Sequence, residues 1–245
     1  MTQLTELNRR SFVVSSAATA AGFTLGLRLP LDGESAAAAT DVPEVNAWVV
    51  IKPDDTVVVR IARSEMGQGT LTGLAQLVAE ELECDWSKVT TEYPTPGTNL
   101  KRNRVWGSFS TGGSRGIRQS QKYVREGGAA ARMMLIEAAA KSWNVPTAQC
   151  SVSKGVITHQ ASGRTTTYGK VADAAAKLTP PSSVKLKDVK DWTIAGKPLK
   201  RLDTPDKVTG AQVYGFDLKL PGMLVANIKT CPVFGGTLKS FDAAK

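Results

Sequence analysis

Two glycine-containing loops hold the residue types that are best suited to bind a ligand. In the first, at residues 65–70, Gly67, Gln68 and Gly69 stand between an apolar alternating segment and a segment with helical apolar spacing. Glycine lets backbone N–H groups approach a ligand closely, and the start of a helix favours a negative charge. The Gln68 amide both donates and accepts hydrogen bonds. The loop could therefore bind the polar edge of a heterocycle or a phosphate. A plain tight turn is the alternative, because the third glycine of a dinucleotide fingerprint is missing.

The second loop, at residues 107–116, places hydroxyl side chains beside a glycine pair and opens another helical segment. We expect Gly112, Gly113 and Ser114 to contact a ligand, and Arg115 to act as the counter-ion of a phosphate. Ordinary helix capping by Ser and Thr is the alternative. Two such loops suit a phosphate-bearing cofactor better than either loop does alone.

The charge distribution also favours an anionic ligand. The chain of 245 residues has a net charge of +9, and residues 101–132 contain eight Lys or Arg side chains but one acidic side chain. Such a basic segment attracts anions, while a solvated helix face is the alternative. A nucleic-acid partner is not expected, because few aromatic residues lie in the basic segment.

Histidine and cysteine usage limits the chemistry of this chain. The single histidine, His159, stands beside a turn and is expected to be exposed to solvent, which excludes a catalytic triad or a metal site built on histidine. Cys84, Cys150 and Cys231 are far apart and form no C-x-x-C pair, so each is expected to be a small buried apolar side chain. An iron–sulfur centre would have to belong to a partner.

The N-terminus has the features of an export signal. Arg9 and Arg10 are followed by Phe12, by a mildly apolar run at residues 15–27 and by four alanines at 36–39. This order is typical of a twin-arginine signal peptide, which we place at residues 1–40, and it predicts a periplasmic protein exported in the folded state. A cytosolic amphipathic start is the alternative.

The elements around the two loops predict an α+β fold. Alternating β-branched residues flank a hairpin turn at 52–55, and apolar residues at helical spacing follow the first loop. In the long alanine-rich segment, Gly127 and Gly128 are expected to kink or loosen the helix. We expect strands at 46–51, 56–62, 89–93 and 165–168, a small hairpin around 154–155, and helices at 71–82, 117–143 and 170–177.

Beyond the leader, the chain is predicted to divide into three parts. Residues 41–180 contain both loops, and at 42% hydrophobic residues the chain can bury a sizeable core. Two prolines then interrupt the pattern, and the polar stretch at 181–200 is typical of a linker. Residues 201–245 begin a second β-rich unit, with strands expected at 211–216 and 223–229.

Three segments of the chain resemble one known family, that of the xanthine dehydrogenases and aldehyde oxidoreductases. Residues 64–72, Ser-Glu-Met-Gly-Gln-Gly-Thr-Leu-Thr, followed by 76–82, resemble its molybdopterin-binding motif. Residues 108–115 look like the second cofactor loop of the same domain. The start of the family's α/β hammerhead domain is similar to residues 201–203, 207–210, 214, 217, 220–224 and 240–242.

The order of these segments narrows the resemblance to one group. The hammerhead segment follows the Met-Gly-Gln-Gly segment, whereas in xanthine dehydrogenases it precedes it. With a twin-arginine leader, this permuted order is similar to the isoquinoline oxidoreductase β-subunit group, which includes bacterial membrane-associated aldehyde dehydrogenases. The resemblance covers nearly all of residues 45–245.

The resemblance implies the large subunit of a molybdenum hydroxylase that holds molybdenum through a molybdopterin cytosine dinucleotide. Residues 67–69 carry over as cofactor contacts, followed by residues 112–114. The implied reaction oxidises a small molecule, either an aldehyde or an N-heteroaromatic such as isoquinoline, with water as the oxygen source. Electrons pass to [2Fe–2S] clusters in a small partner subunit and then to an acceptor such as a cytochrome c. The complex is either free in the periplasm or associated with the inner membrane through a partner.

The family's catalytic glutamate lies in a Gly-Glu motif near the far C-terminus of a longer chain, and no residue here corresponds to it. We therefore assign no catalytic residue and no metal ligand, and expect no activity from this chain alone. It is expected to be a fragment, or one part of a split large subunit whose remainder is a partner. The alternative function is that of an exported, non-enzymatic protein that binds anionic ligands through its basic loops.

Overall fold

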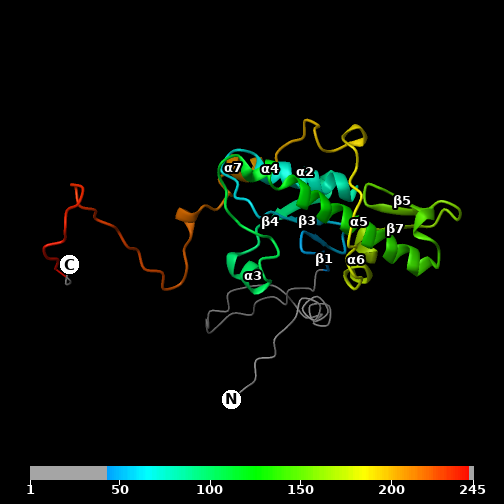
Figure 1. The fold of residues 1–245 in the computed structure, drawn as a ribbon, viewed down its shortest axis with the longest axis horizontal. Helices are drawn as coiled ribbons and strands as arrows, with labels where there is room; N and C mark the ends of the chain where they lie inside the picture. The colour runs from blue at the N-terminus through cyan, green and yellow to red at the C-terminus, as the bar shows by residue number, and fades with distance from the viewer. Residues whose placement is uncertain (1–42, 243–245) are drawn as a thin grey trace, which may run out of the picture. The chain divides into compact units, whose positions relative to one another are not determined.

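The computed structural model describes residues 43–242, and the chain divides into two compact units, Met1–Thr204 and Pro205–Lys245. The predicted signal peptide lies outside the described residues. In the first unit, helices α2 (Thr70–Leu82) and α5 (Gln121–Trp143) pack against a four-stranded sheet (Figure 1). A smaller three-stranded sheet lies beyond α5. The mixed strands and helices confirm the predicted α+β fold class.

The larger sheet has the strand order β1-β2-β3-β4. The first three strands pair antiparallel, with Val49 opposite Val59 and Ile51 opposite Val57, which confirms the predicted hairpin. The fourth strand pairs parallel with the third, because α2 returns the chain to the same end of the sheet. The strands are β1 (Glu44–Asn46), β2 (Val49–Ile51), β3 (Val57–Arg60) and β4 (Val89–Glu92).

Helix α2 begins and ends as its sequence predicts. Its apolar residues at helical spacing, among them Leu74, Val78 and Leu82, are buried in the core. Gly69 precedes the helix with φ 82° and Glu83 follows it with φ 55°, and both left-handed residues redirect the chain. The first loop therefore leads directly into a helix whose apolar face is packed in the core.

The long helix predicted at 117–143 is interrupted after its first turn. The structure has α4 (Arg115–Arg118), a break at residues 119–120, and then α5. At the break, the buried Ser120 hydroxyl accepts hydrogen bonds from Arg63 Nε at 3.0 Å and from the Tyr123 hydroxyl at 2.6 Å. A contact with a distant part of the chain therefore decides where the helix starts.

At Gly127 and Gly128, where a kink or loosening was expected, α5 continues without interruption. The glycines instead allow close packing. A Cβ atom at Gly128 would lie 2.6 Å from the Val78 carbonyl oxygen of α2, and one at Gly127 would lie 2.7 Å from Trp48 Cδ1. The two helices approach so closely because no side chain separates them at this point.

The smaller sheet confirms the predicted hairpin and adds a helix to the core. Tyr168, at the start of α6 (Tyr168–Ala176), is buried and its hydroxyl donates to the Leu82 carbonyl oxygen at 2.6 Å. His159 was expected to be exposed, but it is 5% exposed, with ring nitrogens 2.7 Å from Ser162 Oγ and 3.0 Å from Gln149 Oε1. The strands are β5 (Cys150–Ser153), β6 (Val156–His159) and β7 (Thr165–Thr167), in antiparallel order.

The stretch predicted as a linker, residues 181–200, contains no α-helix or strand but is fixed to α2. The Glu80 carboxylate accepts backbone hydrogen bonds from Thr193, Ile194 and Ala195 at 2.5–3.0 Å, and Lys187 Nζ lies 2.5 Å from it. Glu81 accepts from the Lys187 backbone N–H at 3.0 Å. Buried carboxylates thus add to the apolar contacts that Trp192, Ile194 and Ala195 make with the core.

Short elements complete the described part of the chain. They are α3 (Pro96–Lys101), α7 (Thr204–Thr209) and the 3-10 turns η1 (Trp86–Lys88), η2 (Thr147–Gln149), η3 (Val189–Asp191) and η4 (Gly215–Asp217).

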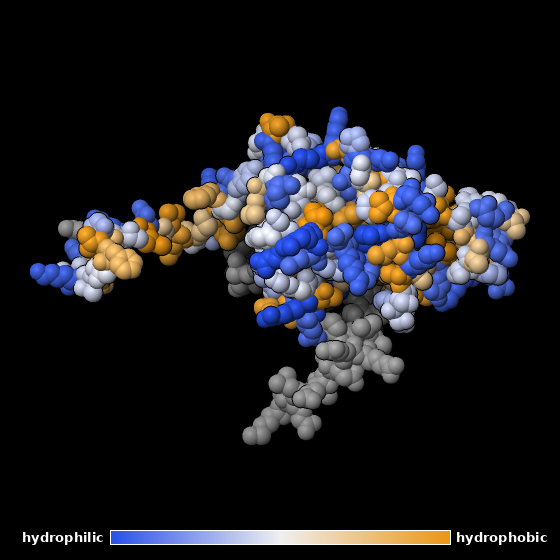
Figure 2. All heavy atoms as spheres, turned by 45° about the horizontal axis from the view of Figure 1, so that its top comes forward, coloured by the Kyte–Doolittle hydropathy of each residue, from blue (hydrophilic) through white to orange (hydrophobic). Residues whose placement is uncertain are grey.

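In the second unit, the strands expected at 211–216 and 223–229 are not formed. Residues 205–242 hold the end of α7 and the turn η4, and no strand among them pairs with another described segment. Apolar side chains are exposed along this stretch (Figure 2). A strand needs a hydrogen-bonding neighbour, and no described residue supplies one. Between residues 43 and 242, no helix has the length and apolarity of a membrane span.

We expect Gly128→Ala to lower the free energy of unfolding by about 1–2 kcal/mol. Its methyl group meets the Val78 carbonyl oxygen, and overpacking costs about 1–3 kcal/mol, more than the helix propensity gained. The control is Gly97→Ala in α3, where the added methyl group enters open space. Urea unfolding of both variants tests the close helix contact, which an unchanged midpoint for Gly128→Ala would contradict.

Candidate functional site

The two predicted loops lie side by side, joined by a buried arginine that sequence reasoning missed. Arg63 is 7% exposed and donates from Nε to Ser120 Oγ and from Nη1 to the carbonyl oxygens of Ser108, at 2.9 Å, and Ser110. The Ser64 N–H also donates to Thr111 Oγ1 at 2.9 Å. The sequence signal for this contact was a cation directly after the strand expected at residues 56–62.

A second close contact joins the helices that follow the loops. A Cβ atom at Gly116 in α4 would lie 2.6 Å from Thr70 Oγ1, at the first residue of α2. On the next turn of α2, Gly73 lies against the Ile117 side chain. Gly116 and Gly73 thus let α4 pack on the start of α2, which holds both loops at one end of the fold.

The Glu65 carboxylate occupies the start of α2, where an external anion was expected. One oxygen accepts hydrogen bonds from the Gly67 and Gly69 N–H groups at 2.7 and 3.0 Å, and the other accepts from Leu71 N–H at 3.0 Å. The side chain is 5% exposed. Burial alone would raise the pKa of Glu65, but these hydrogen bonds and the charge of Arg201 lower it below its ordinary value of 4.5. The first loop therefore carries its own anion.

The Gln68 amide shapes the loop from within. Its Oε1 accepts from Met66 N–H at 2.5 Å, and its Nε2 donates to the Ser64 carbonyl oxygen at 2.8 Å. The backbone N–H of Gln68 has no partner among the described residues and the residue is exposed. Open space lies beside Gly67 and Gly69, where an added Cβ atom would meet nothing within 4 Å. A ligand can therefore reach this backbone.

The second loop presents more free donors than the first. Within the described part of the chain, the N–H groups of Gly112, Gly113 and Ser114 make no protein hydrogen bond. Arg115 folds back on its own loop: its Nε donates to the Gly112 carbonyl oxygen at 3.1 Å and its Nη2 to Ser110 Oγ at 3.0 Å. The predicted counter-ion thus also braces the loop, and the free N–H groups are available to an acceptor from outside.

Ion pairs, most of them with other segments, neutralise part of the basic stretch. Among its eight cations, Arg102 pairs with Glu44, Arg125 with Glu81 and Arg132 with Glu83, and Lys122 Nζ lies 4.0 Å from Glu126. The charge available to an anionic ligand is therefore smaller than the sequence count indicates. The cations left without an acidic partner among the described residues are Lys101, Arg104, Arg115 and Arg118.

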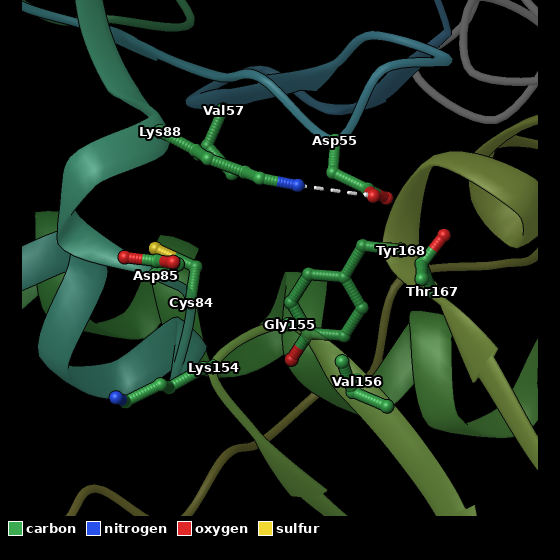
Figure 3. A pocket seen from close by; sticks show the side chains of 10 residues that line it. All are labelled: Asp55, Val57, Cys84, Asp85, Lys88, Lys154, Gly155, Val156, Thr167 and Tyr168. Atoms are coloured by element: carbon green, nitrogen blue, oxygen red, sulfur yellow. Dashed lines mark hydrogen bonds and ion pairs between the residues drawn. The ribbon is translucent and has the colours of Figure 1, made fainter.

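A cavity lies away from both loops, between the larger and the smaller sheet. It has a volume of about 70 Å³, and Asp55, Lys88, Cys84 and Tyr168 are among its lining residues (Figure 3). Burial raises the pKa of the Cys84 thiol to about 12, so it is a poor nucleophile. The cavity has room for a few waters and is far smaller than a usual ligand pocket of roughly 300–1,000 Å³. In the part of the chain that the structure describes, no cluster of His, Cys, Asp or Glu is placed to hold a metal ion.

We expect Glu65→Gln to lower the free energy of unfolding at pH 7 by about 1–3 kcal/mol, because the amide nitrogen cannot accept the hydrogen bonds of the oxygen it replaces. The pKa of Glu65 is lower in the folded chain than its ordinary value of 4.5. Its stabilising effect is therefore present above pH 4.5 and is lost as the pH falls through the folded pKa.

Urea unfolding at pH 7 and in acid measures this effect. The difference between wild type and Glu65→Gln should shrink as the pH falls. Glu137→Gln, which removes an exposed pair with Lys141, is the control and should change little at either pH. A difference for Glu65→Gln that persists in acid would show that the carboxylate charge is not what holds the loop.

Three curated proteins are similar to this chain. The β subunit of isoquinoline 1-oxidoreductase from Brevundimonas diminuta is 31% identical over 94% of this chain and 34% of its own length. A membrane-bound aldehyde dehydrogenase of Gluconacetobacter polyoxogenes, with pyrroloquinoline quinone in its name, is 32% identical over 96% of this chain and 31% of its own length. A nicotinate dehydrogenase subunit from Pseudomonas putida is 25% identical over 78% of this chain and 16% of its own length. The chain spans about a third of the length of the first two relatives.

Two solved structures and one family model complete the comparison. A Cu,Mo-containing CO dehydrogenase matches 51% of this chain and 15% of its own chain, with 21% identity and a TM-score of 0.38. Quinoline 2-oxidoreductase from Pseudomonas putida 86 matches 56% of this chain and 17% of its own chain, with 18% identity and a TM-score of 0.35. The model of the molybdopterin cofactor-binding domain matches residues 12–217, which include both loops and the segment fixed to α2. The chain belongs to the molybdopterin cofactor-binding domain family.

Proposed function

We propose that this chain is the N-terminal part of the molybdenum-cofactor-binding large subunit of a molybdenum hydroxylase. The observation that carries the proposal is the family match across both loops, together with the joint that Arg63 makes between them. Each loop alone could be an ordinary turn. Two loops held together at one end of the fold, with free N–H donors on an exposed side, favour a shared ligand.

The loops fit different parts of a molybdopterin dinucleotide. In the first loop, the carboxylate of Glu65 already satisfies the N–H groups at the start of α2, so a phosphate is disfavoured there. The free N–H of Gln68, with open space beside Gly67 and Gly69, suits the uncharged polar edge of a heterocycle instead. The second loop has the free N–H groups of residues 112–114 near the Arg115 and Arg118 guanidinium groups, which suits a phosphate. When bound, the cofactor supplies the two-electron redox centre.

The role of this chain would be to bind and orient the cofactor rather than to transfer protons. Glu65 is the acid nearest the proposed ligand, but its carboxylate is buried, ionised and already hydrogen bonded. It is therefore a poor general base. We infer that the residue for proton transfer belongs to a part of the large subunit outside this sequence.

The names of the relatives suggest the class of substrate that we propose for this protein. Isoquinoline and nicotinate are N-heteroaromatics, and the second relative acts on an aldehyde. We propose an aldehyde or an N-heteroaromatic as substrate, with water as the oxygen source. Proposed partners are a [2Fe–2S] small subunit, the remainder of the large subunit and a cytochrome c acceptor. The proposed form of the cofactor is the cytosine dinucleotide.

We expect Gly69→Val in the assembled protein to lower molybdenum and pterin content about tenfold, since backbone strain of roughly 1–3 kcal/mol would distort the loop. Gly69 has φ 82°, a conformation that a branched side chain avoids. Gln68→Ala should have a smaller effect in the same direction, because it removes the two hydrogen bonds of the amide.

The control is Gly163→Val, which adds the same side chain at φ 66° with open space around it, in the connection between β6 and β7. Metal analysis and mass spectrometry of the extracted cofactor give the readout. Equal cofactor loss in Gly69→Val and Gly163→Val would show that general instability, and not the first loop, causes the loss. Recovery of pyrroloquinoline quinone without molybdenum would contradict the proposed cofactor, although one relative carries that name.

We also propose export to the periplasm by the twin-arginine route. Replacement of both Arg9 and Arg10 by Lys should leave the precursor in the cytoplasm, because the route depends on the arginine pair. Arg28→Lys, which makes the same exchange outside the pair, is the control. Cell fractionation and immunoblotting measure the distribution, and a wild-type periplasmic yield of the Lys-Lys variant would contradict this route.

A further inference from the structure

Arg201, which lies far from the first loop in the sequence, holds that loop in place by hydrogen bonds. Arg201 donates from Nη1 to the Gly67 carbonyl oxygen and from Nη2 to Glu65 Oε1, both at 3.0 Å. Asp203 fixes the guanidinium group through two hydrogen bonds of 2.9 and 2.8 Å, and the Leu202 N–H donates to Thr72 Oγ1 at 3.0 Å. All these residues belong to the first unit. The segment is therefore tied to both the loop and α2.

The bond to Gly67 decides the direction of one peptide group. In a trans peptide, the carbonyl oxygen and the next N–H point in opposite directions. Because the Gly67 carbonyl oxygen faces Arg201, the Gln68 N–H points away from it. That N–H has no partner among the described residues, and Gln68 is exposed. Glycine at 67 restricts the orientation of this peptide less than other residues would, and the bond from Arg201 favours the observed one.

The bond to Glu65 secures the remainder of the loop. Glu65 is 5% exposed and accepts three backbone hydrogen bonds, while the Arg201 side chain is 36% exposed. A buried carboxylate needs a cation or further donors to stay charged. Arg201 reaches this carboxylate as a cation from outside the loop, so removing it weakens the hold of Glu65 on Gly67, Gly69 and Leu71.

We propose that Arg201 is a positioning residue for the cofactor: it holds the Gly67–Gln68 peptide and the Glu65 carboxylate so that the Gln68 N–H faces the bound heterocycle. This inference rests on the proposed function. It assigns a role in ligand binding to a residue that lies beyond both loops and contacts the ligand only through them.

The test compares Arg201→Met and Arg201→Lys with wild type by hydrogen exchange and by cofactor content. In Arg201→Met, the amides of Gly67, Gly69 and Leu71 should exchange about tenfold faster, because the loop loses the charged hydrogen bonds from Arg201 to Glu65 and to the Gly67 carbonyl oxygen. Amides of α5 should be unchanged. Cofactor content of the assembled protein should fall several-fold, and Arg201→Lys, which keeps a cation, should recover part of both effects. Arg164→Met, which removes another arginine with local hydrogen bonds, is the control.

Each other outcome overturns the proposal. Unchanged exchange at Gly67, Gly69 and Leu71 would show that Arg201 does not hold the loop. Faster exchange with normal cofactor content would leave Arg201 a purely structural residue, and faster exchange throughout α5 would show general destabilisation. Absence of molybdenum and pterin from the wild-type protein would refute the proposed function itself. That failure would be visible before any variant is compared.

Discussion

Buried carboxylates at the two ends of α2 are the constraint on which this structure depends. A carboxylate removed from water costs several kcal/mol unless hydrogen bonds and cations compensate for it, at roughly the scale of a domain's whole stability. Glu65 lies before the helix, and Glu80 and Glu81 lie near its end. Their partners come from α5, from the stretch at 187–195 and from Arg201. Segments of the first unit that are distant in the sequence are thus bound to the two ends of α2.

The same constraint makes the two loops differ in how their N–H groups are satisfied. The first loop satisfies its N–H groups with its own carboxylate, so its shape is set before any ligand arrives. The second loop keeps three N–H groups without a protein partner among the described residues, next to Arg115 and Arg118. Arg63 joins the two loops, and glycines at 116 and 73 let α4 lie against α2. A preformed loop beside a donor-rich loop suits a ligand with an uncharged polar end and an anionic end.

The second unit lacks this kind of support. Apolar residues of 205–242, such as Leu224, Ile228 and Phe234, are exposed, and the expected strands are not formed. The side-chain hydrogen bonds of Thr209 and Gln212, and that of the Tyr214 N–H with Asp217, join residues at most four positions apart. This chain spans about a third of the length of the first two relatives. Strand propensity alone does not fold a segment that has no partner.

The sequence by itself determined the local elements and the place of the two loops. The hairpin at 49–60, helix α2, strand β4 and the small sheet follow from apolar periodicity and turn residues, which act over a few positions. Only the tertiary structure decided what depends on distant contacts. The break before α5 needs Arg63 at Ser120, the glycine pair packs closely against Val78 and Trp48, and His159 is buried against Gln149. Likewise, Arg201 and Glu65 are separated by more than a hundred residues, and no local pattern shows that a buried carboxylate at one will require the cation at the other.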